Sequence, residues 1–199
     1  ASKYDKASEY AAQLIVIAIL CSLCFSFLGY FFSPIIIKLM GANGDLAYYS
    51  EIFLKITFLD MPFTFIFFCF NSIMSSQGNT LTPTILSSIS VIINALLDPI
   101  LIFKLNMGIA GAPVATLISK ALLAAAGLYI LKRSSSKIKP RLKGFRFNKA
   151  IIVKLFKVAL PSAVGQTGSA LGFIILNGFI VSYGTATMAA FGMVNRITS

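Results

Sequence analysis

The chain has 199 residues, of which 57% are hydrophobic and only 12% are charged, and its mean hydropathy is +0.87. Soluble domains carry about a quarter charged residues, so this composition excludes an ordinary soluble domain and indicates an integral membrane protein. The net charge of +11 must then be explained by where the basic residues lie relative to the membrane.

Apolar stretches long enough to cross a bilayer follow one another along the chain, since about 20 helical residues span roughly 30 Å of hydrocarbon. The candidate spans are residues 11–37, 53–74, 81–103, 109–131 and 151–181, and a sixth begins near Thr185 and is cut off at Ser199. The stretches lack the alternation of barrel strands. We therefore expect an all-α, polytopic transmembrane helical bundle, with part of the long fifth stretch forming an interfacial helix.

The connections between the first four spans are short and rich in Gly and Asn, which predicts that sequential helices are antiparallel neighbours. The next connection is different, because residues 132–157 contain ten Lys and Arg residues and no acid. The positive-inside rule places this basic loop in the cytoplasm, and with it the amino terminus. A nucleic-acid partner is not expected, since no stacking array or folded binding module accompanies the loop.

One acid lies deep in the third span. Placing a carboxylate in hydrocarbon costs about 2.5 kcal/mol or more, and such acids mark ion, proton or substrate paths. Asn94 precedes Asp98 by four residues and so shares its helix face, and Thr116 on the fourth span has a similar depth below the same membrane boundary. Oxygen ligands of this kind suit a hard cation or a proton. The sequence predicts a shared site formed by Asn94, Asp98 and Thr116.

Other interpretations of these polar residues remain open. Asp98 pairing with Lys120, or capping Asn94, would make it a structural acid. Asn94 and Asn177 also suit a role in holding helices together through hydrogen bonds. Glu51 and Asp60, near the start of the second span, are interpreted as interfacial.

Small and sulfur-containing residues have structural interpretations. Gly168 and Gly172 have the spacing that permits close helix packing. Cys21 and Cys24 form a C-x-x-C pair, but the chain has no second pair and no histidine, so buried, unreactive thiols are expected.

Several runs resemble one family in order along the chain. NALLDP at 94–99 and GIAGAPVAT at 108–116 resemble the fifth and sixth helices of the multidrug and toxic compound extrusion (MATE) transporters. SQGN at 76–79 resembles the turn after the fourth helix, LPS at 160–162 the start of the seventh, and residues 183–199 the start of the eighth.

The resemblance implies a twelve-helix transporter with two lobes, of which this chain is a piece. Residues 1–131 would supply four helices of the amino-terminal lobe, 132–150 the basic cytoplasmic inter-lobe loop, and 151–199 the start of the carboxy-terminal lobe. The family's cation or proton site carries over to Asn94, Asp98 and Thr116, and a lobe-lining asparagine to Asn71. Residues 161–181 contain no acid, which implies the DinF-like branch.

The implied function is secondary active multidrug efflux in the plasma membrane, exchanging Na+ or H+ for amphipathic, often cationic drugs. The implied partners are the lipid bilayer and the drug, with no cofactor except the coupling ion, no enzymatic activity, and a monomer as the full-length form. The alternative is a lipid-linked oligosaccharide flippase of the same superfamily, which would need several cavity cations where only Lys120 qualifies. A membrane enzyme is disfavoured because histidine and paired acids are lacking.

Overall fold

The computed structural model describes residues 3–41, 43–133 and 147–182. The predicted sixth span and most of the basic loop lie outside these residues. The chain divides into two compact units, Ala1–Phe147 and Asn148–Ser199, and each is described by itself. The predicted division into two lobes stays a prediction.

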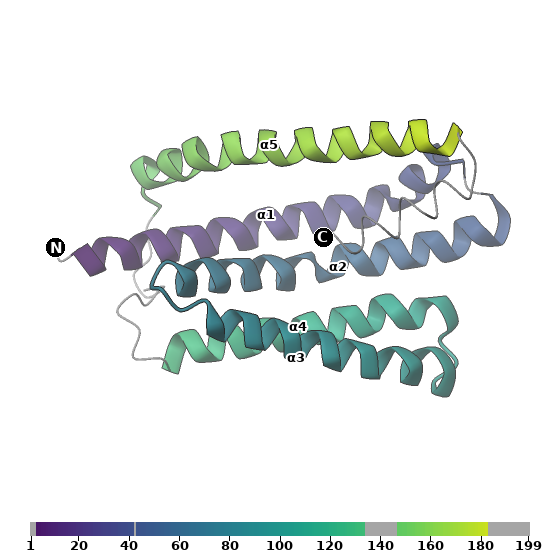
Figure 1. Ribbon diagram of the computed structural model, residues 1–199, viewed down its shortest axis with the longest axis horizontal. Helices are drawn as coiled ribbons and strands as arrows, with labels where there is room; N and C mark the ends of the chain where they lie inside the picture. Colours follow the sequence, from purple (N-terminus) through teal and green to yellow (C-terminus); the bar gives the residue numbers. More distant parts are fainter. Residues whose placement is uncertain (1–2, 42, 134–146, 183–199) are drawn as a thin grey trace. The chain divides into compact units, whose positions relative to one another are not determined.

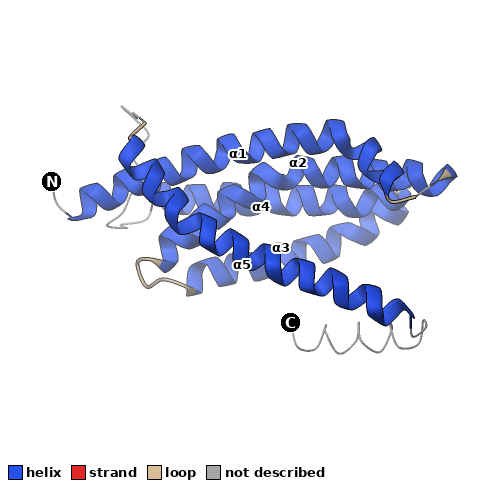
Figure 2. Ribbon diagram, turned by 90° about the horizontal axis from the view of Figure 1, so that it is seen from above, coloured by secondary structure: helices blue, strands red, loops and turns tan. Residues whose placement is uncertain are grey.

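The first unit contains four long helices, α1 (Lys3–Leu39), α2 (Gly44–Ser75), α3 (Leu81–Pro99) and α4 (Gly111–Arg133), and the second contains α5 (Lys149–Ser182). Within the described residues, five helices are long and apolar enough to cross a membrane. Figure 2 shows helices joined by loops throughout the described part of the chain. The predicted all-α transmembrane class is confirmed.

The second helix is longer than predicted. Its first residue is Gly44 rather than residue 53, and the added turns hold polar residues that a hydropathy argument omits. Among them Glu51 and Lys55, four residues apart, form an ion pair with Nζ 2.5 Å from Oε1. This extension places Asp60 in the middle of the helix rather than near its start.

The predicted short connections are confirmed as tight turns. Gly78 has φ 81°, a left-handed conformation that glycine adopts without steric cost, and its N–H donates to the Ser75 carbonyl at 2.9 Å. Asn79 Oδ1 then accepts a bond from the Thr82 N–H, in the first turn of α3, at 3.1 Å. Sequential helices of the first unit run in alternating directions (Figure 1).

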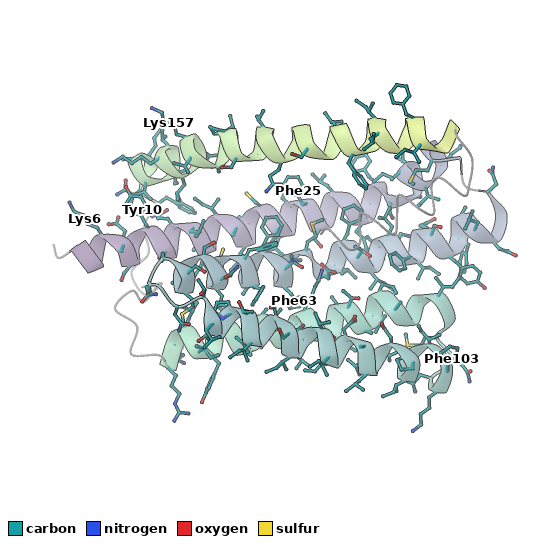
Figure 3. The ribbon with its side chains drawn as sticks, viewed as in Figure 1. Lys6, Tyr10, Phe25, Phe63, Phe103 and Lys157 are labelled. Atoms are coloured by element: carbon teal, nitrogen blue, oxygen red, sulfur yellow. The ribbon has the colours of Figure 1, made fainter. Side chains whose placement is uncertain are left out.

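Within the first unit, α2 packs against both α1 and α4, and α4 packs against α3. Figure 3 shows Lys6 and Phe103 at opposite ends of this unit. A buried cluster joins α1, α2 and α4, and consists of Ala11, Ile15, Cys69, Phe70, Ile73, Met74 and Leu131. Most other large apolar side chains of the unit are exposed, which suits contact with lipid tails or with further helices.

The end of α3 is irregular. Pro99 has no N–H to donate, so it interrupts the α-helical ladder, and the chain continues as a π-helical turn over Ile100–Lys104. The Leu105 N–H donates to the Ile100 carbonyl at 2.9 Å. Single π-turns inside helices are frequent at functional sites, and this one follows Asp98 directly.

The glycines of α5 and the cysteines of α1 and α2 differ from what the sequence predicts or leave it untested. Cβ atoms added at Gly168 and Gly172 on α5 would meet no described atom within 4 Å, so their packing role stays a prediction. The cysteines of the described part are free thiols, but Cys24 is exposed, so the expectation that all of them are buried is wrong for this position.

Candidate cation site

Asn94 and Thr116 meet across the α3–α4 pair. Asn94 Nδ2 donates to Thr116 Oγ1 at 3.3 Å, and the Thr116 hydroxyl donates in turn to the Ala112 carbonyl at 3.1 Å. Both side chains are half-buried. Because the Asn94 amide uses its nitrogen here, its carbonyl oxygen is the group left to accept a ligand. The structure thus brings together these two predicted residues, and their role as cation ligands stays a prediction.

Asp98 lies one turn beyond Asn94 on α3. Its Oδ1 atom is buried and has no hydrogen-bond partner among the described residues. Leaving a buried acceptor unsatisfied costs about 1 to 3 kcal/mol, and more for a charged group. An acid held this way is suited to bind a proton or a small cation, since either one satisfies the oxygen.

Lys120 does not pair with Asp98. Its Nζ atom lies 2.9 Å from Asp60 Oδ2, and Thr64 Oγ1 donates to the other carboxylate oxygen, Oδ1, at 3.1 Å. Asp60 is 5% exposed. The interpretation of Asp60 as an interfacial acid is therefore wrong, as is the alternative in which Lys120 neutralises Asp98.

A second polar contact extends along the α3–α4 pair. Ser90 Oγ donates to the Ser119 carbonyl at 3.2 Å, and Ser119 Oγ donates to the Ala115 carbonyl at 2.8 Å. Both serines are buried. Together with the Asn94–Thr116 bond, this contact fixes the register of α3 against α4, and so fixes where Asp98 lies relative to α4.

Asn71 is separate from the other predicted site residues. Its Oδ1 atom accepts a bond from Ser75 Oγ on the same helix at 3.2 Å. It lies 11 residues beyond Asp60 on α2, or about 16 Å along the axis. The structure does not join Asn71 to Asn94 and Thr116, and its role in a substrate cavity stays a prediction. The side chain of Asn177 lies outside the described residues.

Sequence reasoning missed the Asp60–Lys120 pair. The available signal was one acid and one base on two apolar helices, each expensive to bury alone. The wrong start of α2 concealed it, because Asp60 then seemed close to the membrane surface. Counted from the other ends, Asp60 lies 15 residues before Ser75 and Lys120 lies 13 before Arg133, so the two share a depth of about 20 Å.

Comparisons with known proteins show which family the chain resembles. A sequence profile described as MatE matches residues 1–100. The multidrug export protein MepA of Staphylococcus saprophyticus is 31% identical over 162 residues, which cover 81% of this chain and 36% of that protein. MepA of Staphylococcus aureus strain NCTC 8325 is 28% identical over 166 residues, which cover 83% of this chain and 37% of that protein. The chain thus spans about a third of the length of these relatives.

Solved structures show the same fold. A crystal structure of MATE in complex with MaL6 superposes with a TM-score of 0.91 at 21% identity, over 98% of this chain and 44% of that one. An outward-facing MATE family multidrug resistance transporter of the MOP superfamily superposes with a TM-score of 0.87 at 22% identity, over 98% and 44% of the two chains. At this level of identity the likeness carries the fold alone.

Proposed function

This chain belongs to the MatE family, and on that premise we propose that it forms part of a secondary active exporter that exchanges Na+ or H+ for amphipathic, often cationic drugs. The observation that carries the proposal is the buried Oδ1 atom of Asp98, which has no partner among the described residues and lies one turn from the Asn94–Thr116 bond. The relatives named multidrug export protein MepA support the drug as cargo.

The coupling step is a change of charge at Asp98. A proton or Na+ bound there removes a net negative charge from the helical unit, and release restores it. Pro99 and the π-turn at Ile100–Lys104 follow directly, and this end of α3 lacks the regular ladder that would hold it in one geometry. Occupancy at Asp98 then favours one packing of the α3 end over another, since a ligand shifts a two-state equilibrium by its differential affinity.

The wider arrangement follows from the same premise. We place the protein in the plasma membrane with the basic loop at 132–150 in the cytoplasm, in contact with lipid and working as a monomer when full length. It moves its substrate without converting it chemically and uses no cofactor apart from the coupling ion. The flippase alternative is disfavoured because Lys120, the cation that would hold an anionic lipid carrier, is already neutralised by Asp60.

The test is the variant Asp98→Asn, made in the gene product that contains this sequence. We expect it to reach the membrane in folded form and to lose efflux of ethidium in vesicles energised by a Na+ or proton gradient. The loss should exceed about tenfold, which corresponds to only 1.4 kcal/mol of differential binding. Efflux at the level of the unmodified protein would contradict the assignment.

The same vesicles test the branch. Residues 161–181 carry no acid, and we propose that the protein is DinF-like, with coupling through the helices that carry Asp98. Asp98→Asn should then remove the ion dependence completely. A residual ion-dependent efflux would indicate a second coupling site outside the described helices.

A further inference from the structure

The apolar helices of the first unit contain two acids with opposite environments, the buried Asp60 and the half-buried Asp98. Both oxygens of Asp60 are engaged, Oδ2 by the Lys120 ammonium at 2.9 Å and Oδ1 by the Thr64 hydroxyl at 3.1 Å. Asp98 has a buried oxygen without a partner among the described residues. Asp60 is therefore neutralised by a cation of the protein itself, whereas no described cation neutralises Asp98.

Two acids of α2 form ion pairs within the first unit. On α2, Glu51 pairs with Lys55, and Asp60 pairs with Lys120 of α4. Asp98 forms no ion pair with a described basic residue, and Asp45, the remaining acid of α2, lies in the first turn of that helix. A charge in a membrane interior is costly, and such charges are usually paired or serve a function. Both the pairing of Asp60 with Lys120 and the lack of a described basic partner at Asp98 therefore need a physical explanation.

We propose that Lys120 is the fixed counter-cation of Asp60, and that by occupying this carboxylate it limits the helical unit of α1 to α4 to one mobile cation, bound at Asp98. The inference deepens the proposed function, on which it rests for the identity of the mobile cation. Lys120 thereby sets the ion stoichiometry without touching the transported ion.

The position of Lys120 supports this role. It follows Thr116 by four residues, so the two side chains share one face of α4 about 6 Å apart along the axis. Without the ammonium, the Asp60 carboxylate would offer a second anionic position near the site. Lysine is suited to this task because its ammonium is a compact point charge with three donors, of which one serves Asp60 Oδ2.

The experiment counts cations on the purified gene product that contains this sequence. Equilibrium binding of radioactive Na+ at alkaline pH measures bound sodium, and infrared difference spectra of the carboxylic acid C=O band measure bound protons. Lys120→Met keeps an unbranched side chain of similar length and removes the charge. We expect it to hold one more cation than the unmodified protein, seen either as an extra Na+ or as a new protonated carboxyl band.

The matched control is the double variant Asp60→Asn with Lys120→Met, which removes both charges and should return the count to that of the unmodified protein. A folded Lys120→Met variant with an unchanged count in both measurements would overturn the proposal. If Lys120→Met fails to fold while the double variant folds, the unpaired carboxylate is the cause and the proposal is supported. If neither folds, the pair acts through its structure rather than its charge, and the proposal is overturned.

These outcomes are separable from failure of the proposed function. An unmodified protein that binds neither Na+ nor a proton at Asp98 would refute cation-coupled export. The infrared measurement on Lys120→Met would still report whether Asp60 takes up a proton when its ammonium partner is removed.

Discussion

The contact between Phe70 on α2 and Gly127 on α4 offers a quantitative test of the packing on which the site depends. Phe70 is fully buried, with 0% of its surface exposed. A Cβ atom added at Gly127 would lie 3.0 Å from Phe70 Cγ and 3.2 Å from Cδ1. These distances are shorter than ordinary contacts, and a ring with no exposed surface has little room to move aside.

Phe70→Ala should destabilise the protein by about 2 to 2.5 kcal/mol. Removing the ring leaves a space of about 100 Å³, and a residual cavity costs about 24 cal/mol per Å³. The usual additional cost of losing apolar burial is reduced in a bilayer, because lipid tails are as apolar as the helix interface. The estimate is therefore below the 3 to 5 kcal/mol typical of such a change in a soluble core.

Gly127→Ala should have opposite effects in the two backgrounds. In the unmodified protein the new methyl group overpacks against the ring, at a cost of about 1 to 3 kcal/mol, which outweighs the gain of about 1 kcal/mol in helix propensity. In the Phe70→Ala background the methyl group enters the vacated space. The overpacking then vanishes, so the substitution should stabilise by about 1 kcal/mol or more.

The assay is thermal unfolding of the four purified proteins in one detergent, followed through tryptophan-independent reporters such as a thiol-reactive dye, because the sequence contains no tryptophan. The cycle should give a coupling energy within the range of about 0.5 to 3 kcal/mol seen for residues in contact. If Gly127→Ala has the same sign and size in both backgrounds, the two residues do not touch, and α2 does not pack against α4 at this position.

Two further substitutions test the α3–α4 pair. Thr116→Val removes the hydroxyl that accepts a hydrogen bond from Asn94 at 3.3 Å. We expect the half-saturating Na+ or H+ concentration for efflux to rise about tenfold or more, with little change in thermal stability, because such interhelical bonds average about 0.6 kcal/mol. An unchanged half-saturating concentration would exclude Thr116 from the site. Gly111→Ala places a Cβ atom 2.9 Å from the Ile102 backbone nitrogen. Because a backbone atom cannot rotate away as a side chain can, the melting temperature should fall by an amount equivalent to about 1 to 3 kcal/mol. A variant as stable as the unmodified protein would show that the π-turn is not held against α4.

The Asn94–Thr116 contact could be predicted because a short turn fixes the register of an antiparallel pair. Residues equally distant from the turn meet, and the midpoint of 94 and 116 is residue 105, which directly follows the π-helical turn after α3. Ser90 and Ser119 obey the same arithmetic and also meet. Local chemistry at one turn is therefore enough to place this part of the site.

The Asp60–Lys120 contact could not be predicted in this way. The two residues are 60 positions apart and lie on α2 and α4, which run in the same direction and are joined through α3. No single turn sets their relative depth, which depends on how α2 slides and rotates against α4. The start of α2 at Gly44 also depends on polar residues that hydropathy assigns to a loop.

By sequence, Asp60 is interpreted as interfacial and Asp98 as an acid deep in a span, whereas the structure places both within long apolar helices. Their difference arises from α4, which presents Lys120 to Asp60 at 2.9 Å and presents Thr116 to the face of α3 that carries Asn94 and Asp98. A helix that supplied a base at both positions would leave no acid free for a mobile ion, and one that supplied none would leave two. The four-residue spacing of Thr116 and Lys120 on one face of α4 is thus the feature that separates a structural acid from an acid available for coupling.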